Sequence, residues 1–230
     1  MRINLLESLS DNIVIDKDKC TFCGACVQAC TLDNLRMKLA PCRRACPLGV
    51  NCQGYVQLIA RGREPEAVDL LRETLPFPGV LGRICSQPCE EACRRREVDG
   101  QAVAIRALKR YVLEAADGPA PVPALAPDTG KKVAILGAGP AGLLAAHDIR
   151  LKGHKVTVFD QESEPGGLLR WAIPEFRLPP TILATDLDLL WRLGVVFQGR
   201  TRLGEDLFWE KLQGDYDAVV TALGCPRPVR

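Results

Sequence analysis

The chain has 230 residues, which is enough for one large domain or two small ones. Its formal net charge is only +2, so charge gives no reason to expect binding to nucleic acid or to an acidic membrane surface. It has no run of about 18 apolar residues and no N-terminal signal-peptide pattern, so we expect a cytoplasmic protein without membrane insertion. Its 11 cysteines, ten of them between residues 20 and 93, therefore predict metal or iron–sulfur ligation rather than disulfides.

The first 40 residues contain the run CTFCGACVQAC, in which Cys20, Cys23, Cys26 and Cys30 follow the spacing C-x2-C-x2-C-x3-C. This is the spacing of a bacterial ferredoxin, whereas zinc sites usually combine two separate C-x2-C pairs. In two-cluster ferredoxins the last cysteine of the run ligates the other cluster. We therefore expect residues 1–40 to form a ferredoxin-like cysteine motif that needs further ligands from elsewhere.

Residues 41–116 are predicted to form short helices separated by cysteine loops. The apolar residues of EPEAVDLLRETL and VAIRALKRYVLEAA recur every three or four positions, as in helices that bury one face. Two further cysteine groups, PCRRACPLGVNC and GRICSQPCEEAC, add the candidate ligands Cys42, Cys46, Cys52, Cys85, Cys89 and Cys93. Ten thiolates suffice for two 4Fe-4S clusters with two left over, and a third cluster would need another kind of ligand or a cysteine from a partner. The spacing leaves open which cysteine binds which cluster.

A change of composition separates the two halves of the chain. The segment DGPAPVPALAPDTG, residues 117–130, is rich in proline, alanine and glycine, and we interpret it as an extended linker. Beyond it, residues 131–230 alternate predicted strands and helices, which indicates a parallel sheet. The predicted fold class is therefore α + α/β: a helical iron–sulfur domain followed by a partial Rossmann-like domain. Cys225 stands alone after a predicted strand, and we expect it to be a small buried residue.

The predicted strand 133–136 is followed directly by G-x-G-x-x-G and then by a helix, which is the context in which this motif binds a dinucleotide. Gly137 permits the tight turn, Gly139 lets the backbone approach a pyrophosphate, and Gly142 allows close packing of helix on strand. The N-terminus of the helix favours the phosphates. Asp160, at the end of the next predicted strand, is placed to bind the ribose. NAD and FAD share this fingerprint, so the motif by itself does not choose between them.

Several motifs resemble one family of redox proteins. GAGPAGL, VTVFD, PGGLLRWAIPEFRLP and DAVVTALGC resemble the flavin domain of the glutamate synthase small subunit, the N-terminal region of dihydropyrimidine dehydrogenase, and NADPH–ferredoxin oxidoreductases of the bifurcating type. The cysteine-rich motifs PCRRACPLGVNCQGYVQLIARGR and FPGVLGRICSQPCEEAC extend the resemblance to roughly residues 40–230.

This resemblance implies an FAD-binding domain beside a helical domain that holds two 4Fe-4S clusters. Carried over to this chain, the matching cluster ligands are Cys42, Cys46, Cys85, Cys89 and Cys93. The positions that the resemblance assigns to FAD binding are Gly137, Gly139, Pro140, Ala141, Gly142, Asp160, Gly167, Leu168, Arg177 and Leu203.

The chain departs from these relatives in three respects. Its ferredoxin-like run lies further upstream than their first cysteines, and Cys52 is unusual for the loop that carries it. Where some relatives have a glutamine or glutamate ligand, this chain has Lys109, which is a poor ligand while protonated, so that cluster needs another ligand such as Cys30 or Cys52. The chain also ends before the nicotinamide domain, so we expect a partner subunit to complete the flavin domain or to accept electrons.

These observations predict an electron-transfer subunit of a larger redox complex, in which electrons pass between FAD and the clusters and on to a partner subunit. No residue has the partners that a general acid or base for an organic substrate would need. Two alternatives stay open: a structural or docking subunit that carries clusters without flavin, and a fragment of an NAD(P)H-dependent oxidoreductase.

Overall fold

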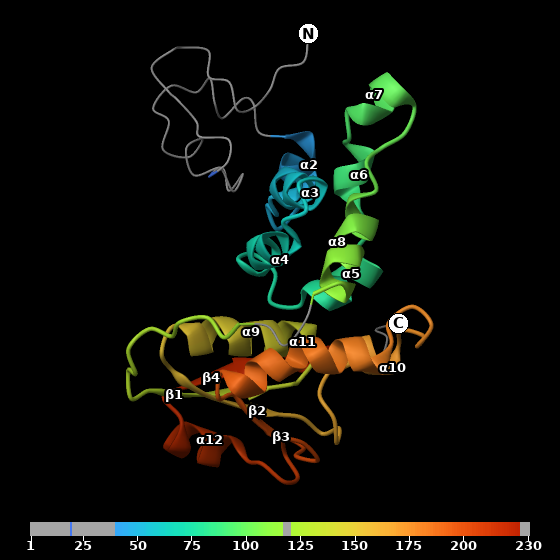
Figure 1. Ribbon diagram of the computed structural model, residues 1–230. Coiled ribbons are helices and arrows are strands. Elements are labelled where there is room, and N and C mark those ends of the chain that lie inside the picture. Colours follow the sequence, from blue (N-terminus) through green and yellow to red (C-terminus); the bar gives the residue numbers. More distant parts are fainter. Residues whose placement is uncertain (1–18, 20–39, 117–120, 226–230) are drawn as a thin grey trace. The chain divides into compact units, whose positions relative to one another are not determined.

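The computed structural model describes residues 40–116 and 121–225, together with Lys19 (Figure 1). Within it the chain divides into two compact units, Met1–Asp117 and Gly118–Arg230. Each unit is described by itself. The ferredoxin-like run that contains Cys20, Cys23, Cys26 and Cys30 lies outside the described residues.

The first unit is helical, as the sequence predicts. Proline occupies the first turn of α2, α4, α5 and α6, where its missing N–H and fixed φ cost nothing. Asn51 caps α3 by accepting a hydrogen bond from the backbone N–H of Gly54 at 3.0 Å. The helices of this unit are α2 (Pro41–Ala45), α3 (Cys52–Ala60), α4 (Glu64–Arg72), α5 (Pro78–Ile84), α6 (Pro88–Glu91), α7 (Arg95–Asp99) and α8 (Ile105–Glu114).

A small apolar core holds these helices together. Its most deeply buried members come from α3, α4 and α8 and from the loop after α4: Tyr55, Leu58, Leu71, Leu75 and Val112. The hydroxyl of Tyr55 donates a hydrogen bond of 2.8 Å to the carbonyl of Ile105, which ties α3 to α8. Cys52 and Cys89 belong to the same core. The backbone around these two cysteines is therefore positioned by apolar packing as well as by anything the thiols bind.

The second unit is a parallel four-stranded sheet with strand order β3-β2-β1-β4, which confirms the predicted Rossmann-like fold class. Val133 of β1 lies opposite Val156 of β2 and Ala218 of β4. Helices α9 and α11 run along one side of the sheet and α12 lies on the other (Figure 1). The elements are β1 (Lys132–Leu136), α9 (Pro140–Leu151), β2 (Lys155–Phe159), α10 (Leu168–Trp171), α11 (Pro180–Arg192), β3 (Val196–Gln198), α12 (Trp209–Asp215) and β4 (Ala218–Thr221).

The described part of the proline-rich segment, residues 121–130, is exposed and contains no helix or strand. Its last five residues are nevertheless fixed to the sheet unit. The N–H of Ala126 donates to the carbonyl of Leu151 at 2.9 Å, and Thr129 Oγ1 lies 2.7 Å from His154 Nδ1. Gly153 (φ +84°) leaves room for this path, because a Cβ there would come within 2.1 Å of the Pro127 carbonyl oxygen.

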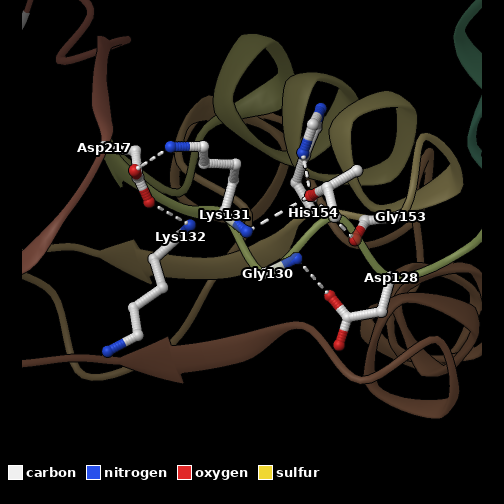
Figure 2. A network of polar contacts seen from close by, with 8 residues as sticks. Asp128, Gly130, Lys131, Lys132, Gly153, His154 and Asp217 are labelled. Atoms are coloured by element: carbon white, nitrogen blue, oxygen red, sulfur yellow. Dashed lines mark hydrogen bonds and ion pairs between the residues drawn. The ribbon is translucent and has the colours of Figure 1, made fainter.

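A polar network continues from this segment to the start of β1, and Figure 2 shows its members side by side. Asp128 accepts a hydrogen bond from the N–H of Gly130 at 2.8 Å. Asp217, just before β4, accepts from the ammonium of Lys131 and from the N–H of Lys132, each at 2.8 Å. Because these contacts join the incoming chain to β1 and β4, they fix the point at which the chain enters the sheet.

None of the helices described over 40–116 and 121–225 is both long and apolar enough to cross a membrane.

Candidate functional site

Four cysteines line one cavity of about 300 Å³ in the helical unit. Each comes from the end of a different helix: Cys46 follows α2, Cys52 begins α3, Cys85 follows α5 and Cys89 lies in α6. Helix ends converge here because the apolar core packs these short helices closely. The sequence predicted all four as metal ligands but did not show that they share one cavity.

The thiols around this cavity interact strongly with one another. Hydrogen bonding with Cys42 and Cys89, together with burial, raises the pKa of the Cys52 thiol far above its ordinary value. The same interaction with Cys52 lowers the pKa of Cys89 to about 7 and also holds the pKa of Cys42 below its ordinary value. Cys89 is thus shifted toward the thiolate, the form that binds metal, whereas Cys52 is shifted toward the neutral thiol.

In the loop before α6, the backbone N–H of Gln87 is directed toward the sulfur of Cys85. Gln87 has φ +59°, an uncommon conformation for a residue other than glycine. In this conformation its N–H donates to the sulfur of Cys85 at 3.3 Å. N–H···S hydrogen bonds of this kind tune the potential of iron–sulfur sites, so the strained backbone has a chemical reason to persist.

The other cysteines that the structure describes, Cys42, Cys93 and Cys225, do not line this cavity. Cys42 and Cys93 are half-buried in the same unit, and the Cys52 sulfur lies 4.0 Å from the carbonyl oxygen of Cys42. Among the residues that the structure describes, no three His, Cys, Asp or Glu side chains converge closely enough to hold a single metal ion. Cys225 is exposed, so the expectation of a buried residue was wrong: the chain has passed the end of β4 by this point, and no element among the described residues covers it.

One wall of the cysteine cavity is cationic. Arg106 and Lys109, one turn apart on α8, both line the cavity. The guanidinium Nη1 of Arg106 donates to the carbonyl of Cys85 at 2.8 Å. Lys109 is only 8% exposed although it carries an ammonium group. The sequence suggested Lys109 only as a poor ligand. Its helical spacing from Arg106 is the signal that could have revealed this wall.

The glycine loop of the sheet unit is shaped as a dinucleotide site requires. Gly137 has φ +106°, and a Cβ there would come within 2.3 Å of the Ala222 carbonyl oxygen. A Cβ on Gly142 would come within 1.9 Å of the Gly137 carbonyl oxygen, so only glycine allows α9 to pack this closely. A Cβ on Gly139 would meet no atom within 4 Å, which leaves the backbone open to a ligand there.

Pro140 and Ala141 begin α9 directly after this loop. The backbone N–H groups in the first turn of a helix, apart from that of proline, have no partner within the helix. Gly167 lies against the loop from the other side, because a Cβ on Gly167 would be 2.8 Å from the Cα of Gly139. Leu168, which begins α10, is 71% exposed, and Arg177 is exposed in the turn before α11. The structure therefore brings Gly167 to the loop but leaves Leu168 and Arg177 on the surface.

A second cavity, of about 430 Å³, opens at the carboxyl end of the sheet. It brings together Gly137, Asp160 and Leu203, which the sequence predicted. The carboxylate of Asp160 accepts hydrogen bonds from the N–H groups of Ala138 at 2.6 Å and of Glu162 at 2.8 Å. Each carboxylate oxygen can accept further bonds, for example from ribose hydroxyls.

Sequence reasoning missed other residues that line this second cavity, among them Gln161, Thr201 and Arg202. Gln161 directly follows Asp160, and the other two follow β3. Residues at the carboxyl ends of parallel strands are the usual ligand-binding positions in such sheets, so this rule could have identified them once β3 was placed.

Comparison with known proteins assigns both units. Residues 7–119 match the family described as dihydropyrimidine dehydrogenase domain II, 4Fe-4S cluster. Residues 135–192 match the NAD(P)-binding Rossmann-like domain. The glutamate synthase small chain of Mycobacterium tuberculosis is 39% identical over 80% of this chain and 38% of its own length. The chain belongs to the family that unites glutamate synthase small chains, domain II of dihydropyrimidine dehydrogenase and the β subunits of NADPH-Fe(3+) oxidoreductases. It thus combines the family's 4Fe-4S domain with part of its dinucleotide-binding domain.

Other members of the family are β subunits of oxidoreductases. The β subunit of NADP(+)-dependent formate dehydrogenase from Moorella thermoacetica is 39% identical over 94% of this chain and 34% of its own length. The β subunit of NADPH-Fe(3+) oxidoreductase from Geobacter sulfurreducens is 38% identical over 82% of this chain and 28% of its own length. The chain therefore spans between about a quarter and two-fifths of the length of these relatives.

Proposed function

We propose that this chain is an iron–sulfur flavoprotein subunit of a cytoplasmic oxidoreductase complex. In this proposal electrons pass between FAD and 4Fe-4S clusters and on to a partner subunit. The observation that carries it is the shared cavity of Cys46, Cys52, Cys85 and Cys89 within the family's 4Fe-4S domain. The printed names of the relatives, which are β subunits and small chains, support a partner subunit.

We assign one cluster to the four cysteines of this cavity. A cubane cluster takes one thiolate at each of four irons, so its ligands surround a volume rather than a point. Four helix ends around a cavity meet that requirement. In this assignment Cys52 replaces the glutamine or glutamate ligand of some relatives. Cys42 and Cys93, with thiolates of the run from Cys20 to Cys30, then supply the remaining cluster or clusters.

We assign FAD to the sheet unit. Its pyrophosphate would lie against the open backbone of Gly139 and the N-terminus of α9. Asp160 would accept the ribose hydroxyls in the second cavity. The motif PGGLLRWAIPEFRLP, which resembles the flavin domain of the family, favours FAD over NAD(P) as the dinucleotide.

When bound, the flavin would exchange one or two electrons, whereas each cluster would exchange one electron at a time. Together they could pass electrons from a two-electron carrier to one-electron carriers or in the reverse direction. The protein's own contribution is to hold the cofactors and tune them. The core around Tyr55 fixes the helix ends that carry the thiols, and the Gln87 N–H and α8 cations act on the cluster charge.

The test is anaerobic purification of the full chain with whatever co-purifies, followed by assays of iron, sulfide and flavin. We expect about eight or twelve iron atoms per chain, for two or three cubanes, and one flavin. A Cys89→Ser variant should lose one cluster, whereas a Cys225→Ser variant, altered at an exposed cysteine, should keep all of them. Clusters without flavin would instead support the docking-subunit alternative. Folded protein without iron would refute the proposal.

A further inference from the structure

Helix α8 presents two positive charges to the cysteine cavity, and their surroundings differ. The guanidinium of Arg106 is engaged by the carbonyl of Cys85, and the backbone N–H of Arg106 donates to Glu90 Oε1 at 2.7 Å. Glu90 thus places a negative charge beside this end of the wall. Lys109 lines the cavity one turn further along the helix.

The Lys109 residue is only 8% exposed to solvent. Over residues 40–116 and 121–225, no carboxylate forms an ion pair with its ammonium group. Burying a charge without a counter-charge is costly, and proteins normally avoid it. The cavity that Lys109 lines also holds the thiols of Cys46, Cys52, Cys85 and Cys89, which carry negative charge when they bind metal.

A protonated lysine has three N–H donors and no lone pair, so Lys109 is not an iron ligand while charged. Four cysteine thiols already line the cavity, so a fifth ligand is not required. The remaining physical effect of the ammonium is electrostatic. Reduction adds negative charge to a cluster, and a nearby cation in a low-dielectric site favours the reduced form.

We infer that Lys109 raises the reduction potential of the cluster held by Cys46, Cys52, Cys85 and Cys89. This inference rests on the proposed function. Lys109 acts here through charge and not through iron ligation or substrate contact.

The test is a potentiometric titration of the anaerobically purified full chain, followed by electron paramagnetic resonance. Lys109→Met and Lys109→Leu both remove the charge, and Lys109→Arg keeps it. The matched control is Arg110→Met, because Arg110 is the next residue of α8, its side chain is 54% exposed and it pairs with Glu114. Solvent and salt screen the charge of an exposed residue far more than that of a buried one.

We expect both neutral variants to lower the reduction potential of one cluster. The equilibrium constant for its reduction should fall by a factor of ten or more, which is about 59 mV for a one-electron couple. Lys109→Arg and Arg110→Met should stay close to the wild-type potential. Loss of that cluster in both neutral variants, with retention in Lys109→Arg, would also support a requirement for the charge.

Two outcomes would overturn the inference while leaving the proposed function intact. One is a full set of clusters in Lys109→Met or Lys109→Leu with wild-type potentials. The other is an equal effect of Lys109→Arg and Lys109→Met, since that would show a role of shape and not of charge. A wild-type chain that holds no cluster would instead refute the proposed function itself.

Discussion

Adding one methyl group at Gly142 should separate the packing of the sheet unit from its capacity to bind a dinucleotide. In Gly142→Ala the new Cβ would lie 1.9 Å from the Gly137 carbonyl oxygen and 3.3 Å from the Ile135 Cγ2 atom. Carbon and oxygen atoms in protein interiors do not approach so closely, so α9 must shift outwards by roughly 1 Å or more. Such overpacking typically costs about 1–3 kcal/mol of unfolding free energy, which lowers Tm by several degrees in a unit of this size.

Gly139→Ala is the matched variant, because the same methyl group three residues earlier meets no atom within 4 Å. Gly139 has φ −79°, which alanine adopts readily. The lower entropy of the unfolded chain and the poorer helix cap roughly cancel, so the change in stability should stay below about 1 kcal/mol. The methyl group would nevertheless occupy the space through which a pyrophosphate approaches the backbone.

The assay measures both properties on the full chain after anaerobic purification. Thermal unfolding followed by circular dichroism gives stability, and absorbance after denaturation gives the flavin content. We expect Gly142→Ala to lose both stability and flavin, and Gly139→Ala to lose flavin alone. The reasoning would be refuted if Gly139→Ala melted as early as Gly142→Ala, or if it kept its full complement of flavin.

Four further outcomes are expected. Cys52→Ser should lose about four iron atoms per chain in iron and sulfide assays, and unchanged iron would exclude Cys52 as a ligand. Tyr55→Phe removes the hydroxyl that donates to the Ile105 carbonyl and should cost about 0.5–1.5 kcal/mol in chemical denaturation; an unchanged midpoint would show that this hydrogen bond contributes nothing to stability. Asp217→Asn weakens an exposed ion pair with Lys131, so it should lower Tm slightly at low salt and less at high salt, and a salt-independent loss would contradict this cause. Chelation of the clusters should speed amide hydrogen exchange in α2, α3, α5 and α6 more than in β1 and β2, as measured by mass spectrometry, because the thiols join helix ends; equal protection before and after chelation would argue against that link.

Local sequence patterns were sufficient for the fold class. Apolar residues at helical spacing predicted α4 and α8 of the first unit, since a helix must bury one face whatever its neighbours are. The strand before Gly137 and the helix after it gave the G-x-G-x-x-G motif its meaning, and the structure has both as β1 and α9. These features depend on residues within a few positions of one another, so a sequence displays them directly.

Tertiary structure decided which of these residues act together. Cys46 and Cys85 are 39 positions apart, and only the packing of short helices around Tyr55 brings their loops to one cavity. The same packing places Lys109 in the wall of the cavity that these thiols line, although the sequence suggested only that Lys109 is a poor cluster ligand. Cys225 was wrongly expected to be buried, because burial depends on what covers the end of β4 and not on the strand pattern before it. The spacing of cysteines along the chain indicates which residues are available as ligands. Whether distant loops come together depends on how all the helices pack against one another.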